Sequence, residues 1–292
     1  MSPVIVGLGE VLWDVFPDSE HFGGAPANVA IHAAALGAKA SLISAVGNDR
    51  RGDEALARLD DTGVNRDAVA QLLGRPTGVV NVTVDARGQP KFDIVPDVAW
   101  DYLPWSRAVE EVARRADAIC FGTLAQRGTI SRATIQRAIT ATSSGAWRLF
   151  DVNLRQHYFD EPVVLASLAM ANAIKLNDEE LPVIARFCSL PAASAVDQLR
   201  TLCDSFGLKL AALTRGAAGS ILVSTGAVCE SPAQRTEVRD TVGAGDAFTA
   251  ALLVGLLNRR PLAEVSERAN AVAAYVCSQP GATPAIPDAL RW

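Results

Sequence analysis

The stretch Asp240-Thr241-Val242-Gly243-Ala244-Gly245-Asp246-Ala247-Phe248 leads into a run from 249 to 257 that is apolar almost all round. Such a run is typical of a buried helix. The two glycines before it allow a tight turn and let the backbone approach a ligand closely. The amides of residues 244–246 would then lie at the helix N-terminus, where intrahelical acceptors are lacking and the helix dipole is positive. The stretch therefore predicts an anion-binding site.

Asp246 is expected in the first turn of that helix. A carboxylate at this position could simply interact favourably with the helix dipole. It could equally take a proton from a hydroxyl group that attacks a phosphoryl group held by the neighbouring amides. The residues around Asp246, taken alone, leave both interpretations open.

The pattern Asp-Thr-x-Gly-Ala-Gly-Asp-x-Phe resembles the C-terminal signature of the ribokinase-like (PfkB) carbohydrate kinases. In that family the last Asp of the signature is the general base, and the Gly-Ala-Gly amides stabilise charge on the transferred phosphoryl group. The resemblance therefore implies catalytic roles for Gly243, Ala244, Gly245 and Asp246. It also implies ATP as the phosphoryl donor, with Mg²⁺ as the accompanying ion.

Composition is that of an ordinary globular protein, with 49% apolar and 20% charged residues over 292 positions. The net charge of −5 argues against nucleic acid or an anionic membrane as the main partner. The N-terminus shows no export signal and no apolar run reaches the length of a membrane span, so we expect a cytoplasmic protein. The five scattered cysteines predict reduced thiols, and the three histidines form no metal-binding pattern.

Strand and helix patterns alternate from the N-terminus: a strand at 4–10, a helix at 27–36, a strand at 40–46 and a helix at 52–62. This order is typical of a mostly parallel sheet covered by helices. Residues 77–96 interrupt it and predict a β-hairpin with its turn at 85–88. Further helices are expected near 106–116, 130–142, 194–206 and 262–279, and further strands at 118–122, 148–152, 173–176, 209–214, 220–224 and 227–231.

The resemblance covers nearly all of residues 4–287 and implies the fold. It predicts one ribokinase-like domain over residues 1–292, a three-layer α/β sandwich with a central, mostly parallel sheet. A small β lid would come from residues near 12–24 and 78–96. In the family such a lid excludes water, so that ATP hydrolysis does not compete with transfer to sugar. The hairpin could pair with its copy in a homodimer, or serve as the lid of a monomer.

Two N-terminal features resemble the sugar-binding part of the family. Gly23-Gly24-x-Pro26-x-Asn28 is similar to the N-terminal signature, in which the glycine pair and the Asn contact sugar hydroxyls. Taken alone, the same residues are compatible with a tight turn and a helix cap. Asp14 stands where the family has its substrate-binding Asp, and a carboxylate can accept hydrogen bonds from two vicinal hydroxyls.

Asn177-x-x-Glu180 follows a strand and resembles the N-x-x-E motif that orders Mg²⁺ and its waters against the ATP phosphates. Because Mg²⁺ keeps much of its hydration, the resemblance implies that Glu180 binds it through water. The local sequence, taken alone, favours the simpler explanation of an Asn that caps a helix and a Glu within that helix.

The resemblance implies four further residues in nucleotide binding. Thr214-x-Gly216-x-x-Gly219 closes a strand and resembles the family's phosphate-contacting turn, and Asn270 matches a polar residue near the adenine.

A K⁺ site is also possible by resemblance. In cation-activated relatives, carbonyl groups near Asp240 and Val242 and around Gly281 surround the ion. Ala285 stands where many relatives carry a Ser, so one hydroxyl ligand is missing and K⁺ activation stays open.

The runs Gly9–Asp14, Gly23–Asn28 and Ala99–Asp101 are most similar to bacterial fructokinases of this family. Gly-Gly-Ala-Pro replaces the Gly-Gly-Lys-Gly of ribokinases and sugar-phosphate kinases, which favours an unphosphorylated sugar, and we predict free fructose. Arg155 could bind sugar hydroxyls, or a carboxylate if the substrate is 2-keto-3-deoxygluconate, the second candidate.

Ribose or a nucleoside is a third candidate substrate. A catalytically silent sugar-binding protein is the alternative from another class. The sequence has no P-loop and no nucleophile elbow, and its glycine pattern after the first strand fits a dinucleotide-binding fold poorly.

Overall fold

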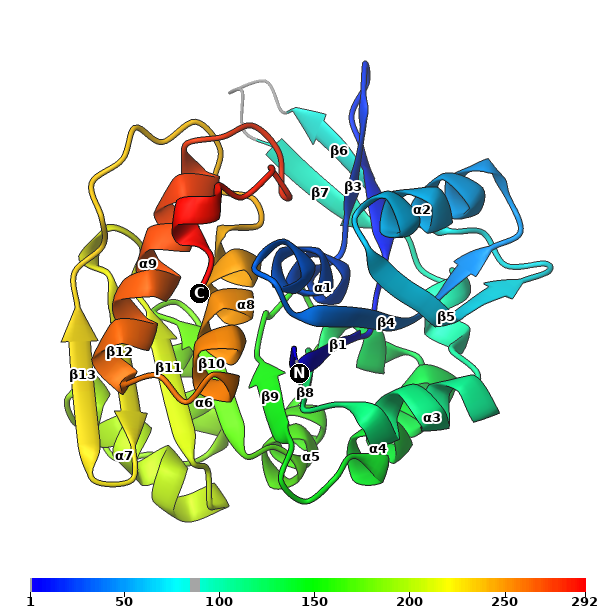
Figure 1. Cartoon of the computed structure of the whole chain (residues 1–292). Coiled ribbons are helices and arrows are strands. Elements are labelled where there is room, and N and C mark those ends of the chain that lie inside the picture. Colours follow the sequence, from blue (N-terminus) through cyan, green and yellow to red (C-terminus); the bar gives the residue numbers. More distant parts are fainter. Residues whose placement is uncertain (1, 85–89) are drawn as a thin grey trace.

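The computed structural model describes residues 2–84 and 90–292, and its strands form two sheets (Figure 1). The large sheet has nine strands in the order β13-β12-β11-β10-β9-β8-β1-β4-β5. Every neighbouring pair from β5 to β11 is parallel, and β12 and β13 are added antiparallel at one edge. The strands are β1 (Val4–Leu8), β4 (Lys39–Gly47), β5 (Val64–Leu72), β8 (Ala118–Phe121), β9 (Trp147–Asp151), β10 (Ala173–Asn177), β11 (Leu210–Thr214), β12 (Ser220–Ser224) and β13 (Ala227–Ser231).

Helices cover both faces of this sheet, which is why its inner strands are apolar on both sides (Figure 1). Along β1, for example, Ile5 packs into the cluster on one face and Val6 into the cluster on the other. One face carries α1 (Ala25–Ala35), α2 (Arg50–Asp61), α8 (Ala244–Leu257) and α9 (Leu262–Cys277). The other carries α3 (Arg107–Arg115), α4 (Thr129–Ala141), α5 (Glu161–Met170), α6 (Leu181–Phe187) and α7 (Ala195–Phe206).

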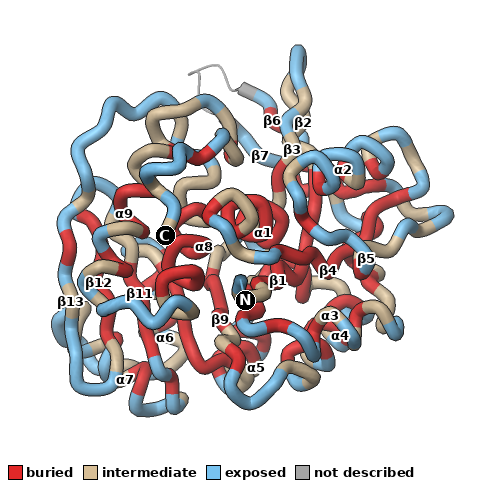
Figure 2. The backbone as a smooth tube through the Cα atoms, viewed as in Figure 1, coloured by how far each residue is buried: buried red, intermediate tan, exposed pale blue. Residues whose placement is uncertain are grey.

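The predicted fold class is therefore confirmed: the chain is a three-layer α/β sandwich around a mostly parallel sheet. Buried residues concentrate in the central strands and in α1 and α8, whereas the outer faces of α2 and α7 are exposed (Figure 2). Among the described residues, no helix combines the length and the apolar character needed to cross a membrane.

The second sheet has four strands in the order β3-β2-β6-β7 and stands at one end of the large sheet (Figure 1). Its strands are β2 (Leu12–Val15), β3 (Glu20–Gly23), β6 (Gly78–Val84) and β7 (Pro90–Ile94). β6 and β7 pair antiparallel, as the sequence predicted for the hairpin strands. The predicted turn at 85–88 lies outside the described residues.

Three of these α-helices and strands have no counterpart in the sequence prediction. β5 is an edge strand with only Val64 and Ala68 buried, so its sequence lacks an apolar alternation. α5 is apolar over most of its circumference and gives no helical period. α6 is only seven residues long, too short for a periodic pattern.

Candidate active site

The N-terminus of α8 has the geometry of an anion site. Gly243 lies in the left-handed region with φ 78°, and a Cβ there would come within 2.2 Å of the Ala282 carbonyl oxygen. Only glycine fits this position. The Ala247 amide donates to the Gly243 carbonyl at 2.9 Å, which is a regular helical bond. The amides of residues 244–246 therefore lack intrahelical acceptors and lie at the positive end of the helix dipole. The Ala244 amide makes a long hydrogen bond of 3.4 Å to the Thr241 carbonyl before the helix.

The Asp246 carboxylate is held beside these amides by a residue 218 positions away. Asn28 in α1 donates from its Nδ2 to Asp246 Oδ2 at 2.8 Å. Burial, and then the negative charge of Asp151, raise the pKa of Asp246 to about 6, while the Asn28 hydrogen bond and the charges of Lys175 and Arg155 oppose the rise. A carboxyl group with this pKa can accept a proton near neutral pH.

Close backbone packing requires glycine at position 24, and Gly23 lies against the Asp14 side chain. Gly24 has φ 108°, and a Cβ on it would lie 2.6 Å from the Glu10 carbonyl oxygen. A Cβ on Gly23 would come within 3.0 Å of Asp14 Oδ2. Asn28 is 4% exposed, and its Oδ1 has no hydrogen-bond partner among the described residues. That oxygen is therefore an available acceptor beside Asp246.

Asp14 lies on β2, opposite His21 on β3. Burial raises the pKa of the Asp14 carboxyl, and the charges of His21 and Arg155 oppose that rise. The same Arg155 charge also lowers the pKa of Asp246, so the guanidinium lies within electrostatic reach of both carboxyl groups. In the described part of the chain, the Arg155 guanidinium makes one hydrogen bond, from its Nη1 to the Leu154 carbonyl at 3.2 Å.

Glu10 is a third carboxyl group here, and the sequence analysis did not single it out. It follows β1, is 3% exposed, and its Oε2 has no partner within the described residues. Burial raises the pKa of Glu10 to about 7, with Arg155 lowering it and Asp246 raising it. One sequence signal could have identified Glu10 as a site residue: it is an acidic residue just after a buried strand, at the edge where parallel strands end.

Asn177 and Glu180 form a compact arrangement at the start of α6. The Asn177 side-chain oxygen accepts the Glu180 amide at 2.8 Å, and Glu180 Oε2 accepts the Asn177 amide at 2.8 Å. Glu180 Oε1 accepts the Leu154 amide at 2.9 Å, so this carboxylate joins the end of β10 to the loop that carries Arg155. No cluster of three or more His, Cys, Asp or Glu side chains suited to a metal occurs in the described ranges.

The turn after β11 lies next to this arrangement, because Thr214 is the register partner of Asn177. Gly216 and Gly219 have φ 51° and 85°, and a Cβ on Gly219 would lie 2.0 Å from the Ser231 carbonyl oxygen. Asn270 on α9 is 7% exposed and donates to the hydroxyl of Ser220, the residue after the turn, at 2.9 Å. The structure thus brings the predicted nucleotide-binding residues together near the point where β10 and β11 end.

The segment around Gly281 is fixed against the glycine turn. Asp240 accepts the amides of Val242 and Gly281, both at 3.0 Å. His32 is fully buried, and burial lowers its pKa to about 4, so its neutral ring donates from Nε2 to the Ala282 carbonyl at 2.9 Å. These contacts hold together the two segments that the resemblance implies for K⁺.

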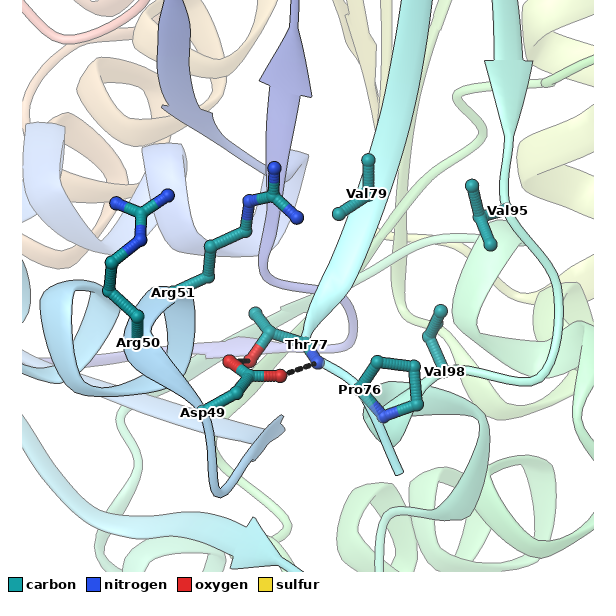
Figure 3. Close-up of a pocket in the computed structure, with 8 residues that line it drawn as sticks. All are labelled: Asp49, Arg50, Arg51, Pro76, Thr77, Val79, Val95 and Val98. Carbon is teal, nitrogen blue, oxygen red and sulfur yellow. Dashed lines mark hydrogen bonds between the residues drawn. The ribbon is translucent and has the colours of Figure 1, made fainter. Parts of the chain in front are cut away.

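A cavity of about 440 Å³ lies on the face of the four-stranded sheet opposite to the Asp14 side chain (Figure 3). Val79 lines it and is the register neighbour of Trp13, whereas Asp14 points to the opposite face by strand alternation. Asp49 closes its base by accepting the Thr77 amide and hydroxyl at 2.8 and 2.7 Å. None of the predicted site residues lines this cavity, so it is separate from the site that contains Glu10, Asp14 and Asp246.

Comparisons with known proteins identify the family. The sequence profile of the pfkB family carbohydrate kinases matches residues 9–289. The fructokinase of Klebsiella pneumoniae is 31% identical, over 98% of this chain and 97% of its own.

Two solved structures are also similar. An uncharacterized sugar kinase from Pyrococcus horikoshii in complex with ATP is 29% identical with a TM-score of 0.82, covering 96% of this chain and 94% of that one. A fructokinase from Xylella fastidiosa with bound ATP has a TM-score of 0.85 at 24% identity, covering 98% and 96%. The chain therefore belongs to the PfkB family of carbohydrate kinases, enzymes that transfer a phosphoryl group to a sugar.

Proposed function

We propose that this sugar kinase transfers the γ-phosphoryl group of ATP to a primary hydroxyl of free fructose. The observation that carries the proposal is the Asp246 carboxylate, held at 2.8 Å by Asn28 beside the three amides that begin α8. Phosphoryl transfer to a hydroxyl requires a proton acceptor beside an anion-binding turn, and this arrangement supports the proposal.

In the proposed step, the Asp246 carboxylate accepts the hydroxyl proton. The hydroxyl oxygen forms a bond to the γ-phosphorus, and the bond from that phosphorus to the bridging oxygen breaks. ADP leaves with the electron pair of the broken bond, and the product is the sugar phosphate. The amides of residues 244–246 stabilise the negative charge on the oxygens of the group in transfer.

Mg²⁺ bound with ATP would neutralise charge on the phosphates. The residues present fit an ion held through water, because both oxygens of Glu180 already accept backbone amides at 2.8 and 2.9 Å. We propose that Asn177 and the turn from Thr214 to Gly219 bind the nucleotide where β10 and β11 end, and that Asn270 on α9 also binds it. For K⁺, we propose a site at the segments that Asp240 joins.

The charge of the sugar side favours a neutral acceptor. Glu10, Asp14 and Asp246 gather there, and Arg155 is the cation whose charge acts on all three. Three carboxyl groups disfavour a substrate that already carries a phosphate. They also supply acceptors for several sugar hydroxyls, as does Asn28 Oδ1.

2-Keto-3-deoxygluconate is the second candidate substrate. The Arg155 guanidinium has a single hydrogen bond within the described ranges, and it could pair with a carboxylate in bidentate fashion. A ribose or nucleoside acceptor ranks behind both. The aminoimidazole riboside kinase of Salmonella typhimurium is 28% identical to this chain.

We propose that the four-stranded sheet is a lid within a single domain. It carries Asp14, and two side chains connect its β7 to the Arg155 loop: Gln156 donates to the Phe92 carbonyl at 2.7 Å, and the Tyr158 hydroxyl to Ile94 at 3.0 Å. Closing it would exclude water from the transfer. β3 and β7 are its edges in the described chain, and a homodimer through the lid would pair such an edge with its copy, which sedimentation would detect.

A cytoplasmic location is part of the proposal. All five cysteines lie in the described residues and are free thiols, as is usual in a reducing compartment.

The test is a coupled ADP-release assay with Mg·ATP against fructose, ribose, 2-keto-3-deoxygluconate and adenosine, each with and without K⁺. We expect turnover with fructose to exceed that with the other acceptors clearly. Preference for another acceptor would contradict the fructose assignment and keep the mechanism. ATP binding without turnover on any of the four acceptors would contradict all these substrates and favour either a sugar outside this set or a silent sugar-binding protein.

A further inference from the structure

Lys175 places a buried positive charge against the anion-binding turn. It lies on β10, two residues before Asn177, and its side chain is 8% exposed. A Cβ built on Gly245 would come within 3.2 Å of Lys175 Nζ, so the ammonium group contacts the first turn of α8. The sequence analysis assigned no role to this residue.

A cation in this place is unfavourable unless something compensates for it. The N-terminus of a helix is the positive end of its dipole, and a buried ammonium group loses its hydration. Asp151, at the end of β9, supplies part of the compensation through a 3.0 Å ion pair from its Oδ1 to Lys175 Nζ. The Thr249 hydroxyl of α8 lies 2.8 Å from Asp151 Oδ2 and 3.0 Å from the Gly245 carbonyl oxygen, and its one proton is shared between these two acceptors.

The compensation is incomplete. An ammonium group has three donors, and Lys175 has one acceptor among the residues that the structure describes. Although burial lowers the pKa of Lys175, the charges of Asp151, Glu180 and Asp246 raise it above its usual value. The group is therefore charged at neutral pH, with donors left for an anion at the turn.

We propose that Lys175 donates hydrogen bonds to oxygens of the γ-phosphoryl group of ATP and follows that group through its transfer, with Asp151 and Thr249 as positioning residues. This inference rests on the proposed ATP-dependent transfer to sugar. Lys175 keeps its proton throughout, because the proton of the sugar hydroxyl goes to Asp246. Its charge adds to that of the amides of residues 244–246, where negative charge accumulates as the bridging bond of ATP breaks.

Lys175→Met tests the proposal because it removes the charge and keeps most of the side-chain volume. We expect kcat with the best acceptor to fall about 10²- to 10³-fold. In calorimetry without sugar, the Kd of Mg·ATP should rise about tenfold, whereas the Kd of Mg·ADP, which has no γ-phosphoryl group, should change less than about twofold.

Two further variants make the result interpretable. Lys175→Met leaves Asp151 buried without its cation, so the double variant Lys175→Met/Asp151→Asn removes both charges. It should show the same selective loss of ATP affinity even if the single variant folds poorly. Lys209→Met is the matched control: Lys209 precedes β11 at the opposite end of the strands, over the Trp147 ring, and its loss should change neither Kd.

Equal weakening of ATP and ADP, or an unchanged kcat, in the folded double variant would overturn the inference. Either result would leave the kinase assignment intact, provided that the unmodified protein phosphorylates a sugar. If the unmodified protein turned over no acceptor, the proposed function would fail, and the ATP-to-ADP affinity ratio would still test the Lys175 contact.

Discussion

Asn28→Ala should change the pH dependence of the reaction. Asn28 donates to Asp246 Oδ2 at 2.8 Å, and this bond stabilises the ionised carboxylate, whose pKa is about 6. A hydrogen bond to a charged group contributes about 1.5–3 kcal/mol, which corresponds to about 1–2 pH units. Because a general base acts in its ionised form, activity falls as the pH drops through the pKa. Losing the bond raises that pKa, so the acidic limb should move up by about 1–2 pH units.

The assay is kcat/KM for the best acceptor at saturating Mg·ATP, measured from about pH 5 to 9. Asn28 is also a proposed sugar contact, so the absolute rate of the variant should fall, but the midpoint of the limb does not depend on that loss. Asn65→Ala is the matched control. Asn65 donates to Asp67 Oδ2 at 2.7 Å in an exposed pair outside the site, and its loss should leave the limb in place. If the acidic limb of Asn28→Ala had the same midpoint pH as that of the unmodified protein, Asp246 would not be the group that controls the limb.

Gly243→Ala forces a Cβ to within 2.2 Å of the Ala282 carbonyl oxygen, and we expect the free energy of unfolding to fall by at least about 1–2 kcal/mol in chemical denaturation; wild-type stability would contradict the packing. Arg155→Met should raise KM for fructose about tenfold or more in steady-state assays and leave KM for ATP unchanged; the reverse pattern would place Arg155 on the nucleotide side. Asp101→Asn strands the Arg127 guanidinium, its partner at 2.8 Å with both side chains 9% exposed, and should cost about 3–5 kcal/mol in denaturant. A denaturant midpoint equal to that of the unmodified protein would contradict the stabilising role of this ion pair.

Much of the fold could be predicted because its strong signals are local. The glycine turn before Asp246, the buried helix after it and the hairpin strands are each readable within a short window. β5 and α6 could not be predicted, because an exposed edge strand and a seven-residue helix take their shape from their neighbours.

The site divides in the same way. The resemblance assigned Asn28 to the sugar and Asp246 to proton transfer, but no sequence pattern indicated that these two side chains, 218 residues apart, are hydrogen-bonded. Glu10 and Lys175 were missed because a charged residue beside an apolar run is equally compatible with solvent exposure. Only the packing of parallel strands and α8 shows that both are buried near the same turn.

Replacing Asp246 by Asn tests the central claim most directly, because it removes the proton acceptor and keeps the shape of the side chain. The account predicts that sugar-dependent ADP release falls about 10²- to 10⁴-fold, the usual contribution of a general base. Calorimetric binding of Mg·ATP should persist, because the amides of the α8 turn remain. A variant that phosphorylates sugar at the rate of the unmodified protein would contradict the assignment of Asp246 as the base.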